Sequence, residues 1–240
     1  GVQHHAAMVG CMNKAIMQIA PNNAEYLIEQ CMRQYGLDRG SKMARQAVEA
    51  GYDYLWIMDD DTLPNPDALA ELWAAHGRLN GEYGFLSSTV LWTDGKECRM
   101  NRQKIRKRFF ERIELLQFGM VQIEQATFVS LFFPAQVVVE EGLPIKEFFI
   151  WFDDIEYTLR ITRAGFKNYY TEQSIVVHKT PDVYDPNIEQ APVNMAKRFY
   201  YQTRNTCYFK HREQPNKLLF RLSIWNKLRI LKRRINRRKD

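Results

Sequence analysis

Three adjacent carboxylates, Asp59, Asp60 and Asp61, directly follow the apolar run 52–58. Neighbouring carboxylates repel one another, and a divalent cation offsets that repulsion; hard oxygen ligands suit Mg²⁺ or Mn²⁺. In an extended stretch Asp59 and Asp61 point the same way, so both could bind one ion while Asp60 faces elsewhere. The alternative is a solvated acidic turn that caps the next helix. The apolar run before the triplet favours the metal.

A second acidic group, Asp153 and Asp154, follows two aromatic residues in the segment 151–156 (WFDDIE). Both lie at the start of a predicted helix, where the helix dipole favours carboxylates. An anion stabilised in a partly apolar site suits a general base that stays ionised near neutral pH. The alternative role is helix capping. Glu156 and Arg160 are spaced to pair along the same helix.

The third candidate is His178, at the end of the apolar segment 174–178 (SIVVH). A neutral imidazole there could complete a metal site. The alternative is a histidine that is merely packed or solvated at a strand end.

These groups need elements to position them, and the apolar patterns predict one α/β domain of alternating strands and helices. Asn65 is the expected N-cap of a helix with Pro66 in its first position. The predicted strands are 52–58, 84–92, 127–133 and 174–178. The predicted helices are 22–35, 42–50, 67–79, 136–141 and 154–164, with a mostly helical chain from 187 onward.

The composition of the 240 residues, 45% hydrophobic and 26% charged, predicts a globular chain and excludes a disordered one. No apolar run approaches the length of a membrane-spanning helix, and the first residues lack the pattern of a signal peptide. The spacing of the four cysteines fits neither a zinc site nor a disulfide framework. Reduced thiols in a cytoplasmic protein are therefore expected.

The net charge of +6 is concentrated in two basic segments, 99–112 and 221–239. We expect the first to be a long exposed loop, partly helical. In the second, Ile224, Leu228, Leu231 and Ile235 form one helical stripe among lysines and arginines. That pattern suits a helix on an anionic membrane surface. The alternative is a packed terminal helix with a frayed basic end.

The order and spacing of the acidic groups and the histidine resemble the family 2 inverting glycosyltransferases with the GT-A fold. The closest resemblance is to the bacterial branch of galactofuranosyl- and rhamnosyltransferases. It is carried by 47–72 (AVEAGYDYLWIMDDDTLPNPDALAEL), 128–166 (FVSLFFPAQVVVEEGLPIKEFFIWFDDIEYTLRITRAGF), 174–181 (SIVVHKTP) and, more weakly, 197–205 (KRFYYQTRN).

The resemblance implies a GT-A-type (Rossmann-like) fold, with a mixed, mostly parallel sheet flanked by helices. The implied catalytic domain is 1–182, and 183–240 forms a basic helical extension. The N-terminal third lacks the two turns that usually hold the nucleotide base, so the nucleotide-binding part is atypical or incomplete.

The resemblance also implies roles for individual residues. Asp59 and Asp61 match the metal-binding acidic motif, and His178 matches a further metal ligand. Asp60 lies in the same donor-binding turn. Asp154 matches the catalytic base.

Three further residues, Trp151, Asp153 and Glu156, match positions near the sugar- and acceptor-binding pocket. The implied reaction is metal-dependent transfer of a galactofuranosyl, rhamnosyl or similar hexosyl group from a nucleotide-diphosphate sugar. The implied acceptor is a cell-envelope or polysaccharide glycan, either free or lipid-linked. The expected location is cytoplasmic, peripheral on the inner face of the plasma membrane through 221–240.

Two other functions fit parts of the pattern. A nucleotidyltransferase would also use paired carboxylates and a metal. A nucleic-acid binder would use the two basic segments, although the chain has no zinc-finger or RNA-recognition signature and this reading leaves the acidic groups unexplained.

Overall fold

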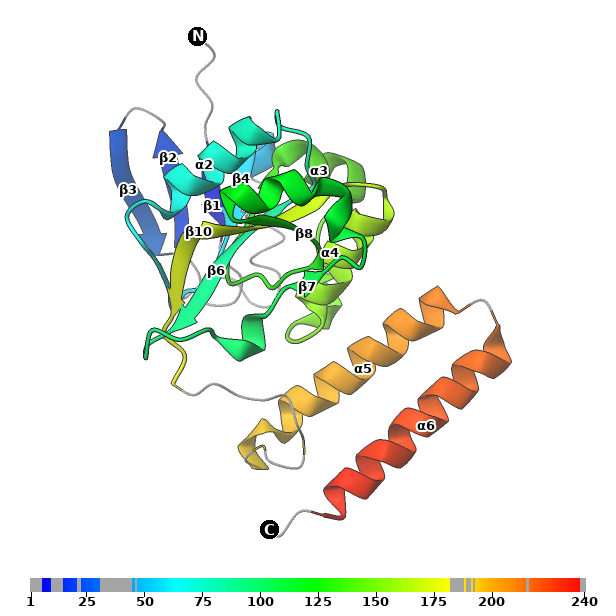
Figure 1. Ribbon diagram of the computed structural model, residues 1–240. Helices are drawn as coiled ribbons and strands as arrows, with labels where there is room; N and C mark the ends of the chain where they lie inside the picture. The colour runs from blue at the N-terminus through cyan, green and yellow to red at the C-terminus, as the bar shows by residue number, and fades with distance from the viewer. Residues whose placement is uncertain are drawn as a thin grey trace.

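The computed structural model describes residues 6–9, 15–20, 23–30, 45, 47–181, 188, 191, 193–214 and 216–237. Its described strands form one mixed sheet, and its chain ends in two long helices (Figure 1). The expected α/β architecture, a mixed sheet flanked by helices with a helical C-terminal part, is confirmed.

The sheet has the strand order β3-β2-β1-β4-β9-β6-β10-β8-β7, and β5 pairs with β10. Its strands are β1 (Ala6–Val9), β2 (Ala15–Ala20), β3 (Asn23–Gln30), β4 (Tyr54–Ile57), β5 (Thr62–Pro64), β6 (Leu86–Trp92), β7 (Lys104–Ile105), β8 (Met120–Gln125), β9 (Leu131–Pro134) and β10 (Asn168–His178).

Most neighbours in the described sheet run antiparallel, so the expectation of a mostly parallel sheet is wrong. Only the β1–β4 and β6–β10 pairs are parallel among the described strands. β9 lies between β4 and β6 and runs antiparallel to both. A strand that is buried on both faces has a continuous apolar sequence whether its neighbours are parallel or antiparallel. The sequence therefore could not distinguish a parallel sheet from an antiparallel one.

Both faces of the central strand β4 are buried, which explains its continuous apolar sequence. Leu55 and Ile57 pack in a core with residues of two helices, α3 (Ala135–Glu141) and α4 (Asp153–Arg163). Trp56, which points the opposite way, packs in a core with α2 (Ala68–Arg78). Successive side chains of a strand alternate between faces, so one short strand joins both cores.

The helix α2 begins later than the sequence predicts. Its N-cap is Asp67, with no side-chain capping bond, instead of Asn65. The backbone N–H of Asn65 donates to the carbonyl of Ile175 in β10 at 3.0 Å. Asn65 is therefore held in the strand-like continuation of β5, and this pairing delays the start of the helix.

The predicted helix 22–35 is also wrong, because β3 occupies residues 23–30 and pairs antiparallel with β2. Sheet pairing overrides the local helical pattern there. The predicted helix 42–50 is helical at residues 45 and 47–49, and its first three residues lie outside the described ranges.

The basic segment 99–112 is more ordered than an exposed loop. It contains a 3₁₀ helix η1 (Arg99–Asn101), strand β7 and the start of η2 (Phe109–Phe118). Asn101 within it is 5% exposed. The segment thus reaches into the core, where one of its side chains contributes to the site described below.

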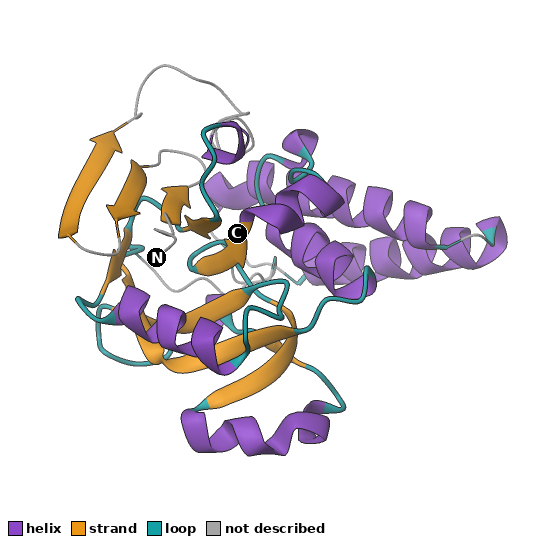
Figure 2. Ribbon diagram, turned by 90° about the horizontal axis from the view of Figure 1, so that it is seen from above, coloured by secondary structure: helices purple, strands orange, loops and turns teal. Residues whose placement is uncertain are grey.

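Among the residues described after the sheet, three segments are helical: η4 (Val193–Met195), α5 (Ala196–Glu213) and α6 (Lys217–Ile235). Figure 1 shows α5 and α6 as an antiparallel pair, and Figure 2 shows the long helices extending to one side of the sheet. Several residues of α5 are buried, whereas α6 has none. No described helix is long and apolar enough to cross a bilayer.

Candidate active site

The acidic triplet lies next to His178 because of the backbone pairing between β5 and β10. Thr62 pairs with His178 in the antiparallel register, and the N–H of Lys179 donates to the carbonyl of Asp61 at 2.8 Å. The N–H of Thr62 donates to the carbonyl of Asp59 at 3.0 Å, which closes a turn. The triplet is therefore a turn and not the extended stretch that was expected, yet Asp59 and Asp61 still face the histidine.

The side chains of Asp59, Asp61 and His178 converge. The Nε2 atom of His178 lies 3.1 Å from Oδ1 of Asp61 and 3.9 Å from Oδ2 of Asp59. One potential ligand atom from each residue lies within 4.8 Å of the others. Two carboxylates and an imidazole at this spacing fit a divalent cation, and carboxylate-rich sets suit Mn²⁺ or Mg²⁺.

Asn101 orients the histidine from the side away from the carboxylates. Its side-chain oxygen lies 2.9 Å from Nδ1 of His178, and its amide nitrogen donates to Oγ1 of Thr127 at 3.3 Å. A carbonyl oxygen only accepts, so the Nδ1 atom carries a proton and Nε2 faces the carboxylates. This is how metal-binding histidines are held in general. Sequence reasoning missed Asn101, because nothing in the segment 99–112 distinguishes it from its polar neighbours.

Burial and the carboxylates act in opposite directions on His178, which is almost fully buried. Desolvation of the ring lowers its pKa, but the hydrogen bond and charge of Asp61, with the charges of Asp59 and Asp60, raise the pKa above the ordinary value. A proton and a metal ion therefore compete for the same position beside Nε2.

The triplet and the second acidic group share one cleft of about 520 Å³. Asp59, Asp60, Asp61 and His178 line one part of it. Trp151, Asp153 and Asp154, which precede or begin α4, also line it. The structure thus brings together all the sequence-predicted site residues except one.

The segment that carries Asp153 and Asp154 into the cleft has a strained backbone. Phe149, Trp151 and Phe152 have positive φ angles of 60°, 60° and 78°. Such conformations cost about 1–3 kcal/mol each in non-glycine residues and need support from surrounding structure.

That support comes from Asn205 of α5, which is fully buried. Its amide nitrogen donates to the carbonyls of Phe148 and Trp151 at 2.7 and 2.8 Å, and to that of Ile150 at 3.3 Å. Arg204 also donates to the carbonyl of Glu147. One helix therefore fixes the whole turn before α4.

Asp154 departs from the sequence expectation of a carboxylate kept ionised by the helix start. Its Oδ1 atom does accept a hydrogen bond from the N–H of Ile155 at 2.7 Å. Burial, and then the charge of Asp153, nevertheless raise the pKa of Asp154 well above the ordinary value. Desolvation outweighs the helix terminus here.

Glu156 is the exception among the site residues, because it does not line the described cleft. It is 1% exposed and forms a two-bond pair with Arg160, at 3.1 Å for each bond, and a further bond with Arg212 at 2.8 Å. The expected pair with Arg160 is confirmed, whereas the implied place near the acceptor pocket stays a prediction. The ion pairs turn this side chain toward α5 and away from the cleft.

Two residues of α5, Arg198 and Gln202, line the cleft and were not predicted as site residues. Both belong to the segment 197–205, whose resemblance to the family was the weakest. The sequence feature that could have indicated them is a cation and an amide spaced one helical turn apart, at Arg198 and Gln202. Arg198 brings a fixed positive charge to a cleft that otherwise holds five carboxylates among its described lining residues.

Trp151 lies in the cleft with its ring packed against Phe199 of α5. The two ring centroids are 5.1 Å apart and the planes meet at 74°. This edge-to-face contact fixes the indole at the cleft wall.

Comparison with known proteins gives one family match. The family model described as "Glycosyltransferase like family 2" matches residues 9–191, well over half of the chain. No curated protein sequence matches significantly. A solved structure of GalNAc-T7 with UDP, GalNAc and Mn²⁺ aligns over 62% of this chain and 31% of that chain, at 14% identity and a TM-score of 0.47.

Proposed function

This chain belongs to the family 2 glycosyltransferases, and we propose that it transfers a hexosyl group with inversion, from a nucleotide-diphosphate sugar to a glycan hydroxyl. The single observation that carries the proposal is the shared cleft, in which the cluster of Asp59, Asp61 and His178 faces the same space as Asp154.

In this proposal Asp59, Asp61 and His178 hold Mn²⁺ or Mg²⁺. The bound ion would neutralise the charge that develops on the leaving diphosphate. The imidazole favours Mn²⁺, because Mg²⁺ prefers oxygen ligands alone. Asn101 keeps the Nε2 atom turned toward the carboxylates, and Arg198 adds a second positive charge for the donor phosphates.

Asp154 would act as the general base. Its carboxylate accepts the proton of the acceptor hydroxyl while that oxygen bonds to the anomeric carbon of the donor. The bond from that carbon to the diphosphate breaks in the same displacement, so the configuration inverts and a nucleoside diphosphate leaves. The raised pKa of Asp154 makes it a stronger base than an ordinary aspartate, closer to the optimum for proton transfer near neutral pH.

The first test is product analysis with a panel of nucleotide sugars and Mn²⁺. Release of a nucleoside diphosphate is expected, whereas release of pyrophosphate would contradict sugar transfer and support a nucleotidyltransferase. Thermal stabilisation by one donor would identify the nucleotide and narrow the choice among galactofuranosyl, rhamnosyl and other hexosyl donors.

The second test is Asp154→Asn, which keeps the shape of the side chain but removes the base. We expect kcat to fall by about 10²- to 10⁴-fold. Binding of the donor, measured by calorimetry, should persist. An unchanged kcat would remove Asp154 from the role.

We also propose that the acceptor belongs to a cell-envelope or other polysaccharide glycan, and that α6 holds the enzyme at an anionic membrane surface. In support, Leu218, Leu222 and Trp225 are 65, 53 and 61% exposed along one helix face. The helix carries many cations and no acidic residue. Exposed apolar and basic side chains on one helix suit the interface of an anionic bilayer.

The exposed apolar residues agree only in part with the expected stripe, of which Leu228 and Ile235 are exposed. Leu231, expected on the membrane face, instead lines a cavity between α5 and α6. Flotation with anionic vesicles tests the association: the full chain should float, and Leu222→Ser with Trp225→Ser should reduce the bound fraction severalfold. Equal flotation of both proteins would remove this face from the proposal.

A further inference from the structure

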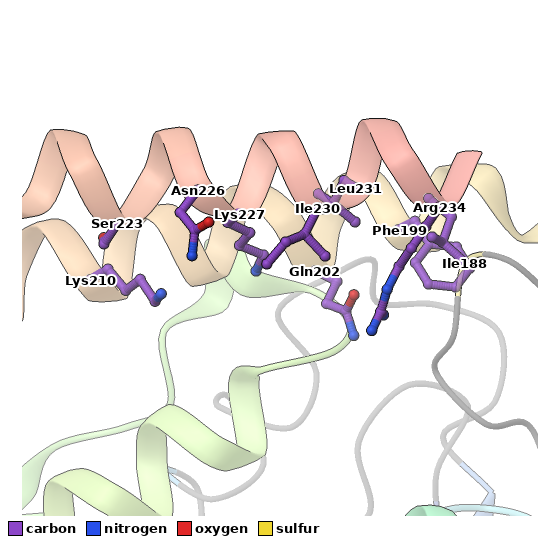
Figure 3. Close-up of a pocket in the computed structure, with 10 residues that line it drawn as sticks. All are labelled: Ile188, Phe199, Gln202, Lys210, Ser223, Asn226, Lys227, Ile230, Leu231 and Arg234. Atoms are coloured by element: carbon purple, nitrogen blue, oxygen red, sulfur yellow. The ribbon is translucent and has the colours of Figure 1, made fainter. Parts of the chain in front are cut away.

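A second cavity, of about 300 Å³, lies between α5 and α6, and nothing in the proposed reaction uses it. Figure 3 shows its lining side chains, with Lys227 and Arg234 pointing from α6 toward α5. These two residues are seven positions apart, and Ile230 and Leu231 lie between them on the same face. We call this cavity the α5–α6 pocket.

Three cations line the α5–α6 pocket: Lys227 and Arg234 from α6, and Lys210 from α5. None of its described lining residues is acidic, and none of the three cations forms an ion pair with a described residue. Arg234 is exposed at one end, whereas Lys227 and Lys210 are partly buried. Lys210 and Lys227 are close enough for their charges to interact. Like charges that are partly removed from water are costly, and a bound anion would offset that cost.

The state of Lys227 is consistent with an unbalanced positive site. Burial lowers its pKa below the ordinary value; the neighbouring Cys207 acts to raise the pKa, and the nearby charge of Lys210 acts to lower it. An anion beside these side chains would favour both charged forms.

The rest of the wall is apolar, which distinguishes this pocket from a simple basic patch. Ile188, Phe199, Ile230 and Leu231 contribute it. An inorganic anion would contact the cations but leave the apolar wall without a partner. An amphiphile with a phosphate at one end would contact both the cations and the apolar wall. Pockets that combine a few charged groups with an apolar wall bind such ligands.

The α5–α6 pocket adjoins the cleft that contains Asp154. Gln202 lines both cavities. Phe199, which lines the pocket, packs its ring against that of Trp151, which lines the cleft. A ligand could therefore reach from one cavity toward the other along one face of α5.

We propose that the α5–α6 pocket binds the phosphate or diphosphate group of an amphiphile beside Lys210 and Lys227, with the apolar chain against Ile230 and Leu231 and directed toward the end of the pocket where Arg234 lies. The further assignment of this amphiphile as the lipid end of the acceptor rests on the proposed glycosyl transfer.

Calorimetry with the full chain tests the site directly, without donor or metal. Three probes separate recognition of the phosphate from recognition of the apolar chain. They are dihexanoyl phosphatidic acid below its critical micelle concentration, inorganic phosphate, and dihexanoyl phosphatidylcholine. The phosphatidic acid should bind at least tenfold more tightly than either of the others. Equal binding of inorganic phosphate would show a plain anion site and overturn the amphiphile.

A pair of double variants separates the pocket from the general charge of α6. Lys227→Gln with Arg234→Gln should weaken phosphatidic acid binding at least tenfold. Lys232→Gln with Arg233→Gln removes the same charge from the same helix outside the pocket, and should change the affinity less than twofold. Equal losses in both double variants would overturn the site.

These measurements separate failure of this site from failure of the proposed reaction. Binding is read without catalysis, so a chain that transfers no sugar could still bind the phosphatidic acid. If sugar transfer is established, the assignment of the lipid end predicts that Lys227→Gln with Arg234→Gln raises KM for a lipid-linked acceptor but not for its lipid-free glycan. Equal changes in both KM values would overturn that assignment.

Discussion

At the scale of single residues, Asp154 combines a partly buried position in the cleft wall with a neighbouring negative charge from Asp153. Its raised pKa means that the folded chain holds the proton more tightly than the unfolded chain. The contribution of this proton to the free energy of unfolding is fully present when the pH is below the ordinary aspartate pKa. The contribution is lost as the pH rises through the raised pKa of Asp154 in the folded chain.

Asp154→Asn should therefore raise the free energy of unfolding at pH 7.5, because the amide never ionises. The gain should shrink as the pH falls toward the ordinary aspartate pKa. Urea denaturation in the presence of a chelator measures both. Asp67→Asn, at an exposed carboxylate outside the cleft, is the matched control and should give no such gain. A gain that is the same at both pH values would contradict this account.

Asn205 is a positioning residue, since it holds the turn that carries the base without lining the cleft itself. Asn205→Ala removes the side-chain donor to the carbonyls of Phe148, Ile150 and Trp151, although the carbonyl of Phe148 still accepts from the N–H of Ile150. A buried group left without a partner costs about 1–3 kcal/mol. We expect kcat to fall at least tenfold, because the strained turn relaxes. Mn²⁺ affinity should be unchanged, because the metal cluster lies on other elements.

Thr206→Val is the matched control for Asn205. Thr206 is also buried in α5, but among the described residues its hydroxyl donates to the carbonyl of Gln202 in the same helix and not to the turn. The control should retain kcat. If the two variants lose kcat equally, the effect belongs to α5 as a whole and not to the turn.

At the scale of elements, Glu156 joins α4 to α5. It receives hydrogen bonds from Arg160 and Arg212, and Arg160 also donates to the carbonyl of Glu141, the last residue of α3, and to that of Leu143 just after it. The carboxylate thus lies at the meeting point of three helices. Breaking a buried ion pair by removing one partner typically costs about 3–5 kcal/mol.

Glu156→Gln should lower the free energy of unfolding by about 3 kcal/mol, the lower end of the range for a buried pair because Arg212 is partly exposed. Urea denaturation measures the loss. Glu213→Gln, which breaks a more exposed pair with Arg163, should cost clearly less. If Glu156→Gln instead left stability unchanged and raised the acceptor KM, the residue would contact the acceptor after all.

The elements also show where local patterns suffice and where they fail. The strand before the acidic triplet, the helix after Phe152 and the strand ending at His178 follow from apolar runs bounded by glycine, proline or charge. The strand at 23–30 could not be predicted, because sheet neighbours and not its own sequence determine its conformation. The late start of α2 has the same cause, since Asn65 pairs with Ile175 across the sheet.

The same distinction applies to the candidate site. Asp59, Asp61, Asp154 and His178 stand out by residue type and by position at the ends of apolar runs. Asn101 does not, because its role depends on a contact with a histidine far along the chain. Glu156 lies outside the lining of the described cleft, because spacing along a helix predicts the pair with Arg160 but not which side of α4 faces the cleft.

At the scale of the whole molecule, binding of a metal ion at Asp59, Asp61 and His178 can be tested by its effect on the stability of the folded chain. A ligand that binds only the folded chain stabilises it by about 2.7 kcal/mol at a concentration 100 times its Kd. We expect Mn²⁺ to raise the melting temperature of the chelator-treated chain. Asp61→Asn should abolish the rise, and Asp60→Asn, in the same turn but outside the cluster, should retain it. A rise that survives Asp61→Asn would place the ion elsewhere.

The pairing of β5 with β10 has one more consequence. Asp61 and His178 are remote in sequence, and a short ladder of main-chain bonds brings them into register. A one-residue slip of that ladder would turn alternate side chains to the opposite surface and separate the histidine from both aspartates. The native register of β5 against β10 is thus required for the three side chains to bind one ion. Binding of Mn²⁺ during refolding would therefore indicate that this register has formed.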